Sequence, residues 1–354
     1  MNILNVNLHN NSYDIVIEKG LFENFRKEIR KVYNGTKIAV ITDSNLFDLY
    51  HTALEEQLSK ENFILNFIVV KPGENSKTMS TLEYVYSNLS SFNITRSDLI
   101  IAFGGGVVGD LAGFAASTYL RGISYIQIPT SLLAQIDSSI GGKVAINLKE
   151  GKNLAGSFYQ PIKVLIDPDI LFSLPEKYIK DGLGEVIKYA CIKDPILFDT
   201  LMSIDSNKQL FNHIEYIIYC CCTIKKQLVE ADERDTDLRM LLNFGHTIGH
   251  AIEKHLNYEI GHGEAVCAGM LYITKNSQLF KYTEAGTYEA MQNMLEHFHI
   301  EYNIPDLTAS HIKKYISLDK KNLGREIKLI LLKKIGDAFI HKVPFSEVDK
   351  FINI

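Results

Sequence analysis

The sequence has no hydrophobic run as long as the roughly 18–20 residues that a membrane-spanning helix needs, and its start lacks the basic and then apolar pattern of a signal peptide. It also lacks an excess of basic charge, since 37 lysine and arginine residues stand against 42 acidic ones. The formal net charge of −5 gives no overall attraction to nucleic acid or to an anionic membrane, so any anion binding must be local. We therefore expect a cytoplasmic protein that binds neither nucleic acid nor a membrane.

Two familiar metal and thiol patterns are missing as well. No CxxC pair occurs among the five cysteines. Three of them, at positions 220–222, are consecutive and would point in different directions on a helix, which makes them poor partners for a metal or a disulfide. We expect reduced thiols in the interior. The pattern HExxH is absent, so the sequence gives no support to that class of zinc protease.

The length and composition indicate a globular protein of two domains, with 354 residues, 46% of them apolar and 22% charged. In the first half, short β-branched runs alternate with amphipathic stretches, a pattern typical of a parallel sheet covered by helices. Strands are predicted at residues 37–42, 63–70, 99–103, 125–128 and 164–166. Helices are predicted at residues 181–192, 211–231, 239–254 and 262–282, with a late strand at 327–332. We predict an α/β domain over residues 1–175 and a helical domain over residues 176–354.

A glycine-rich turn follows the predicted strand 99–103. Residues 104–110 read GGGVVGD and precede a run of small residues, so the order is strand, glycine turn and helix. Backbone N–H groups in such a turn can approach a diphosphate, and the helix N-terminus adds partial positive charge. Asp43 and residues 72–77 follow two other strands, so their side chains are expected at the same edge of the sheet. A tight structural turn and solvated loop carboxylates are the alternative interpretation, because GxGxxG spacing alone is a weak signal.

Three histidines indicate a metal site. His246 and His250 are four residues apart, so both imidazoles are expected on one helical face, with Asn243 one turn earlier. His262 follows between two glycines at a predicted helix start. The glycines at positions 245 and 249 cost helix stability, which makes sense where a ligand or another backbone comes close.

A carboxylate is expected to complete this site, because catalytic zinc takes three protein ligands and keeps one position open. Glu264 and Glu185 are the two candidates that the sequence leaves open. The alternative for Glu185 is an ion pair with Lys188 on a solvated surface.

Several basic residues are flanked by glycine or lie in the predicted helices, and together they suit a small, highly anionic ligand. They are Arg121, Lys143, Lys152, Lys188, Lys225 and Arg239, with a further basic stretch at residues 320–321. Each of them alone could also be an ordinary surface charge.

These motifs, taken in order, resemble the 3-dehydroquinate synthase family of the shikimate pathway. The segments that carry the resemblance are residues 104–110 (GGGVVGD), 137–143 (DSSIGGK), 151–154 (GKNL), 184–188 (GEVIK) and 243–250 (NFGHTIGH). The resemblance implies an N-terminal Rossmann-like domain that binds NAD, an all-α C-terminal domain that holds zinc, with Co²⁺ as an alternative ion, and a homodimer.

The resemblance also implies roles for individual residues. The metal ligands would be Glu185, His246 and His262, which leaves His250 for proton transfer. The residues that would contact NAD are Asp43, Glu74, Lys77, Gly104, Gly105, Gly106, Asp110, Thr130, Ser131, Lys152 and Ser173. The residues that would contact substrate are Arg121, Asp137, Lys143, Asn153, Lys188, Lys225, Arg239, Asn243, His250 and either Lys320 or Lys321. Catalytic roles would fall on His250, Lys143, Asp235 and Arg239.

Departures from the family pattern are few. Asp235 stands where the family usually has glutamate, so its role as proton acceptor stays open. Arg121 would reach the substrate phosphate across the dimer interface.

The reaction implied is the conversion of 3-deoxy-D-arabino-heptulosonate 7-phosphate to 3-dehydroquinate and phosphate. It proceeds through transient oxidation by NAD, β-elimination of phosphate, reduction, ring opening and an intramolecular aldol closure. Three other interpretations remain. A polyol dehydrogenase of the same fold would not need the basic cluster, a related sugar-phosphate cyclase would differ in its pocket residues, and a non-catalytic NAD-binding protein would have lost ligands.

Overall fold

The computed structural model describes residues 1–9, 11–319 and 326–353. It divides into two compact units. The first unit contains Met1–Leu174 and Lys225–Arg234, and the second contains Pro175–Ile224 and Asp235–Ile354. The predicted boundary after residue 175 differs from this division in one respect, because Lys225–Arg234 packs with the first unit.

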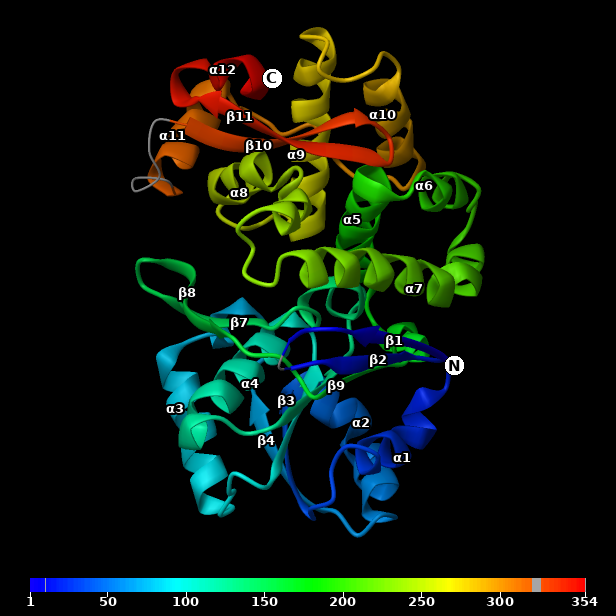
Figure 1. The fold of residues 1–354 in the computed structure, drawn as a ribbon, viewed down its shortest axis with the longest axis vertical. Coiled ribbons are helices and arrows are strands. Elements are labelled where there is room, and N and C mark those ends of the chain that lie inside the picture. Colours follow the sequence, from blue (N-terminus) through cyan, green and yellow to red (C-terminus); the bar gives the residue numbers. More distant parts are fainter. Residues whose placement is uncertain (10, 320–325, 354) are drawn as a thin grey trace. The chain divides into compact units, whose positions relative to one another are not determined.

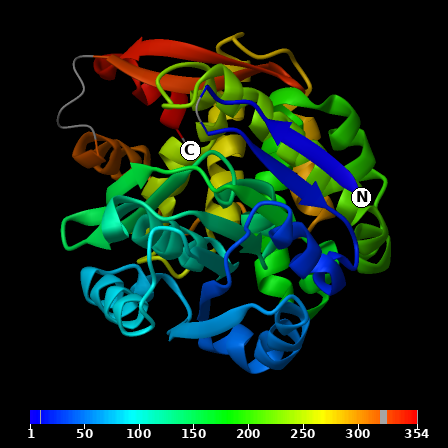
Figure 2. The same ribbon diagram turned by 60° about the horizontal axis from the view of Figure 1, so that its bottom comes forward.

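The first unit is built on a seven-stranded sheet with the order β1-β2-β9-β6-β5-β3-β4. Its strands are β1 (Asn2–Val6), β2 (Tyr13–Ile17), β3 (Lys37–Asp43), β4 (Ile64–Val70), β5 (Leu99–Gly104), β6 (Tyr125–Pro129) and β9 (Lys163–Ile166). All neighbours pair in parallel except β1 and β2, which form the antiparallel hairpin drawn in dark blue in Figure 2. The five strands predicted in this part of the sequence are therefore confirmed, whereas β1 and β2 were missed.

Alternating side chains of these strands supply two separate hydrophobic cores. In β3, Ile38 and Val40 belong to one core while Ala39 and Ile41 belong to the other, as the two-residue period of a strand requires. The helices α1 (Phe25–Arg30) and α2 (Ser44–Ser59) cover one face, and α3 (Met79–Ser91) and α4 (Gly106–Thr118) cover the opposite face (Figure 1). A parallel sheet covered on both faces is the arrangement expected from its uninterrupted apolar strands.

A second hairpin of the first unit was not predicted. It consists of β7 (Lys143–Leu148) and β8 (Gly151–Phe158), which pair only with each other among the described strands. The hairpin carries Lys143 at its start and Asn153 in its second strand. Two residues that the family resemblance assigns to substrate therefore lie in the same hairpin.

The second unit is mainly helical. Its helices are α5 (Glu176–Lys193), α6 (Pro195–Met202), most of α7 (Asn207–Ala231), α8 (His246–His255), α9 (His262–Leu279), α10 (Thr287–His297), α11 (Ala309–Asp319) and α12 (Asp349–Ile352). The late strand is present as β10 (Glu326–Lys334), but it pairs with β11 (Asp337–Pro344) in a two-stranded sheet. No helix among the described residues is both long and apolar enough to span a membrane.

The predicted helix at residues 239–254 is wrong in its first part. A short 3-10 helix covers Leu238–Asn243, and α8 begins only at His246. Gly245 between them has a left-handed backbone with φ of 79°, and a Cβ there would lie 2.4 Å from Cγ of Met270. Asn243 is consequently not on the helix that carries His246, so it does not share the face expected for His246 and His250, which both lie in α8.

The second glycine of this motif allows two helices to approach closely. A Cβ on Gly249 of α8 would lie 3.0 Å from the Cα of Val266 in α9. The glycines therefore accommodate another backbone, which is one of the two explanations that the sequence suggested.

Candidate active site

Three side chains from three helices of the second unit converge on one point. Glu185 lies in α5, while His246 and His262 are the first residues of α8 and α9. The carboxylate oxygen Oε1 of Glu185 lies 3.5 Å from Nε2 of His246 and 3.6 Å from Nε2 of His262. The Asp181 carboxylate fixes the start of α9 by accepting the Gly263 N–H at 2.6 Å, one turn before Glu185.

This donor set fits a tetrahedral metal ion. Glu185 is fully buried, and its Oε1 atom makes no hydrogen bond of normal geometry. Ligand atoms bound at about 2.1 Å around a tetrahedral ion are separated by about 3.4 Å, close to the two separations found here. A buried carboxylate oxygen beside two imidazole nitrogens is therefore explained by a cation that all three would bind.

Each of the three candidate ligands also has a polar group near its second nitrogen or oxygen atom, the one that does not face the other ligands. The Lys188 ammonium donates to Oε2 of Glu185, and the backbone carbonyl of Phe244 lies 3.2 Å from Nδ1 of His246. Nδ1 of His262 lies 3.5 Å from Oε1 of Glu253. The ion pair of Glu185 with Lys188 thus exists, but both side chains are buried, so the solvated-surface interpretation is wrong.

The surroundings shift the pKa values of these groups in different directions. Burial lowers the pKa of His246 to about 3, which leaves a neutral imidazole suited to metal binding. Burial also opposes protonation of His262, but the carboxylates of Glu185 and Glu253 outweigh it and raise its pKa to about 10. Burial disfavours the charge of Glu185, yet Lys188 and the imidazoles hold its pKa well below its usual range.

Metal binding is expected to release a proton from His262. Because its pKa is about 10 in the metal-free protein, His262 carries that proton at neutral pH and must lose it to become a ligand. The logarithm of the zinc affinity should therefore rise by about one unit per pH unit between roughly pH 7 and 9. Competition with a chelator of known affinity at three pH values measures the slope, and a flat profile would contradict it.

The other candidates of this region lie outside the three-residue cluster. His250 is exposed on α8, with its ring centre 5.5 Å from that of His246. Glu264 is in neither group of potential metal ligands found among the described residues. Arg239 is buried, Asn243 is exposed, and Asp235 has a left-handed backbone with φ of 58°.

In the first unit the glycine turn has two kinds of glycine. Gly104 is required by packing, because a Cβ there would lie 2.4 Å from Cβ of Val108. Gly105 has an ordinary φ of −72°, and a Cβ there would meet only the side chain of Ser131, at 3.4 Å. The packing of the protein itself therefore does not require glycine at position 105. The absence of a side chain there leaves space for a ligand at the start of α4.

A polar network adjoins this turn. The buried Lys77 ammonium donates to Asp110 at 2.6 Å and to Asn153 at 2.5 Å. Burial raises the pKa of Asp110 to about 6, against the opposing effect of Lys77. The network thus joins two residues assigned to NAD with one assigned to substrate.

Asn147 of β7, which no sequence motif identifies, holds this network together. Its side-chain amide donates to Glu74 at 2.7 Å and its side-chain oxygen accepts the Asn153 N–H at 2.8 Å. Its backbone N–H donates to the Lys77 carbonyl at 2.7 Å. The partners at 74 and 77 are about 70 positions away, so no local pattern could have identified it.

The other residues of the first unit that the resemblance assigns to NAD or substrate differ in their hydrogen bonds and exposure. Asp43 accepts two N–H groups at the start of α2, Ser173 bonds to Tyr50, and the Lys225 ammonium donates to Asp137. Lys143 and Lys152 are exposed, Thr130 is buried, and Arg121 has a left-handed φ of 68°. Lys320 and Lys321 lie outside the described residues.

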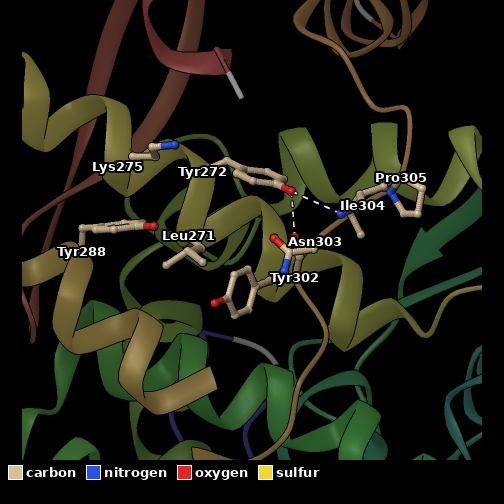
Figure 3. Close-up of a pocket in the computed structure, with 8 residues that line it drawn as sticks. All are labelled: Leu271, Tyr272, Lys275, Tyr288, Tyr302, Asn303, Ile304 and Pro305. Atoms are coloured by element: carbon tan, nitrogen blue, oxygen red, sulfur yellow. Dashed lines mark hydrogen bonds between the residues drawn. The ribbon is translucent and has the colours of Figure 1, made fainter. Parts of the chain in front are cut away.

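The second unit also has a hollow of about 350 Å³ that contains none of the assigned residues. Three tyrosines line it, and Figure 3 shows the Tyr272 hydroxyl, which donates to the Tyr302 carbonyl at 2.7 Å. Leu271 of α9 is one of the residues that line the hollow, and it follows His262 by nine residues in the same helix. At the rise of an α-helix, this separation corresponds to about 13 Å along the axis. It is therefore separate from the metal cluster.

Fold and site together define a class of enzyme with a parallel α/β unit, a glycine turn at the end of a central strand, and a helical unit that bears a candidate metal centre of histidine and carboxylate residues. Residues 67–181 match the N-terminal domain of 3-dehydroquinate synthase, and residues 182–322 match its C-terminal domain. The chain belongs to the 3-dehydroquinate synthase family.

Individual relatives agree with this assignment. A 3-dehydroquinate synthase of Clostridium acetobutylicum is 52% identical over the full length of both chains. The solved structure of 2-deoxy-scyllo-inosose synthase complexed with carbaglucose-6-phosphate, NAD⁺ and Co²⁺ superimposes with a TM-score of 0.88, at 26% identity and over 99% of each chain. ValA, the 2-epi-5-epi-valiolone synthase of Streptomyces hygroscopicus with NAD⁺ and Zn²⁺ bound, gives 0.87 at 26% identity, over 97% of this chain and 96% of its own.

Proposed function

We propose that this protein is an NAD- and zinc-dependent 3-dehydroquinate synthase, a lyase that converts 3-deoxy-D-arabino-heptulosonate 7-phosphate to 3-dehydroquinate and phosphate. The observation that carries the proposal is the buried Glu185 oxygen between two imidazole nitrogens, in a chain of this family. The reaction belongs to the shikimate pathway of aromatic amino acid biosynthesis.

Glu185, His246 and His262 would hold the metal, which when bound supplies Lewis acidity that lowers the pKa of a substrate hydroxyl. His250, exposed next to this cluster, would carry protons on its imidazole. Asp235 and Arg239 are the other residues of the second unit to which we assign catalytic roles.

NAD would lie at the glycine turn and, when bound, accepts a hydride from the substrate and later returns it. The space at Gly105 and the N-terminus of α4 would admit its diphosphate. Glu74, Lys77 and Asp110, held by the network described above, would orient the rest of the nucleotide.

The substrate phosphate would be bound by basic and amide groups of the first unit. Lys143 offers an exposed ammonium and Asn153 an amide on the same hairpin. Arg121 would contribute from the second subunit of a homodimer, which light scattering should detect as a mass of two chains. These groups favour a phosphorylated substrate over the simple polyol of a dehydrogenase.

One assay separates the alternatives. Purified protein with zinc, catalytic NAD and the heptulosonate 7-phosphate should release phosphate and form dehydroquinate in equal amounts, with no net NADH. NADH that accumulates with a simple polyol would indicate a dehydrogenase. Phosphate release without dehydroquinate would indicate a related cyclase, and no turnover with any of these substrates would favour a non-catalytic protein.

Replacing Asn147 with alanine is expected to raise the dissociation constant of NAD about tenfold, because a hydrogen bond to a charged group is worth about 1.5–3 kcal/mol and part of it is regained from water. Titration of NAD by protein fluorescence or calorimetry measures the change. Asn88→Ala is the matched control and should bind NAD like the wild type, because this half-buried asparagine of α3 donates its side-chain amide to the Tyr84 carbonyl of the same helix. Unchanged NAD affinity in the Asn147 variant would contradict the role of this network.

A further inference from the structure

Glu253 is a mostly buried carboxylate beside the candidate metal centre, to which neither the sequence motifs nor the proposed mechanism assigns a role. It lies in α8, seven residues and two turns after His246, so both side chains leave the helix on the same face. Its Oε1 atom lies 3.5 Å from Nδ1 of His262, which belongs to the neighbouring helix α9.

The two nitrogens of the His262 ring face two different carboxylates. Nε2 lies 3.6 Å from Oε1 of Glu185, on the side of the candidate metal, and Nδ1 lies 3.5 Å from Glu253. A neutral imidazole carries its proton on one nitrogen and a lone pair on the other. A carboxylate at Nδ1 keeps the proton there, so the lone pair of Nε2 is available to the metal.

The other two candidate ligands also have a polar partner at the atom that does not face the candidate metal. His246 has the Phe244 carbonyl at Nδ1, and Glu185 has the Lys188 ammonium at the oxygen that faces away from the imidazoles. Glu253 completes this pattern for His262.

We propose that Glu253 is a positioning residue that accepts the Nδ1–H of His262 and so fixes the tautomer and the ring orientation of a metal ligand. The inference rests on the proposed metal centre and adds to it a residue outside the ligand set. Partners of this kind typically contribute ten- to a hundredfold to metal affinity.

A second cation bound by His250, Glu253 and His262 is the competing explanation for the same cluster. It would need a lone pair at Nδ1 of His262 while Nε2 faces the first metal. The ring would then have to lose both protons and bridge two cations, which is far less favourable than one proton held by a carboxylate.

The test compares metal binding by full-length Glu253→Ala and Glu253→Gln with that of the wild type. Each protein is stripped of metal, its folding is checked by circular dichroism, and its zinc affinity is measured by chelator competition. Co²⁺ is then bound, and its visible absorption reports the ligand geometry. Glu259→Ala, which removes an exposed carboxylate just beyond α8, is the matched control.

We expect Glu253→Ala to bind zinc about ten- to a hundredfold more weakly and to change the Co²⁺ spectrum. The zinc affinity of Glu253→Gln should be intermediate, because its amide oxygen still accepts the Nδ1 proton. If the alanine variant does not fold, the comparison of Glu253→Gln with the wild type decides the test. Glu259→Ala should match the wild type.

Two results would overturn the inference and leave the metal centre in place. The first is a zinc affinity and Co²⁺ spectrum like those of the wild type in both Glu253 variants. The second is the binding of two metal ions per wild-type chain and of only one by Glu253→Ala. A wild type that binds no zinc would overturn the metal centre itself, and with it this inference.

Discussion

Substitution of His246 by alanine is expected to remove the metal and to lower kcat/KM by about a thousandfold or more, equivalent to about 4 kcal/mol of transition-state stabilisation. The reason is geometric. His246 supplies one of the two imidazole nitrogens beside the buried Glu185 oxygen, and only Glu185 and His262 remain without it. Metal content by elemental analysis and phosphate release from the heptulosonate 7-phosphate measure the two effects.

The control for this variant is His213→Ala, which removes an exposed histidine of α7 and should keep both metal and activity. If the His246 variant retained one metal per chain while losing activity, His246 would have a catalytic role but would not be a ligand. If it retained both, the candidate centre would be wrong.

The sheet and the main helices could be predicted because their signals are local. A buried parallel strand is a short β-branched run, and its position does not depend on distant residues, so residues 99–103 are identified by their own sequence. The hairpin of β7 and β8 has a weaker signal, because its burial alternates and much of β8 is exposed. Its role in holding Asn147 and Asn153 depends on contacts with residues far away in the chain.

The break before α8 shows why a local helical pattern can mislead. Residues 239–254 have apolar side chains at helical spacing, yet the chain takes a left-handed turn at Gly245. The cause is tertiary, since α9 passes so close that even a Cβ at this position would collide with Met270. The same break places the Phe244 carbonyl beside Nδ1 of His246, so the irregularity also orients a candidate metal ligand.

The choice between the two carboxylates could not be made from spacing either. Glu264 is close to His262 in sequence, whereas Glu185 is 61 residues before His246, and it is the packing of α5 and α8 against α9 that brings Glu185 to both imidazoles. The resemblance to a known family selected Glu185 because it carries information about tertiary contacts that one sequence does not display.

Replacing Lys188 with methionine is expected to destabilise the metal-free protein by about 3 kcal/mol and the zinc-loaded protein by much less. In the metal-free protein the change leaves the Glu185 charge buried without its ammonium partner, and the imidazolium of His262, 3.6 Å away, offsets that charge in part. A bound divalent cation compensates the same carboxylate directly. Urea unfolding with a chelator and with excess zinc measures both free energies.

A buried ion pair in the first unit provides the matched control. Lys163 pairs with Glu28 at 2.8 Å, and both side chains are 4% exposed, so Lys163→Met also removes a buried ammonium from a carboxylate, although Glu28 keeps Lys31 as a second partner. That variant should be destabilised equally with and without zinc. The metal would not be bound at Glu185 if zinc failed to reduce the destabilisation caused by Lys188→Met. The same conclusion would follow if zinc reduced the destabilisation of both variants equally. A rescue confined to Lys188→Met would link the metal to this carboxylate through stability alone, without reference to catalytic activity.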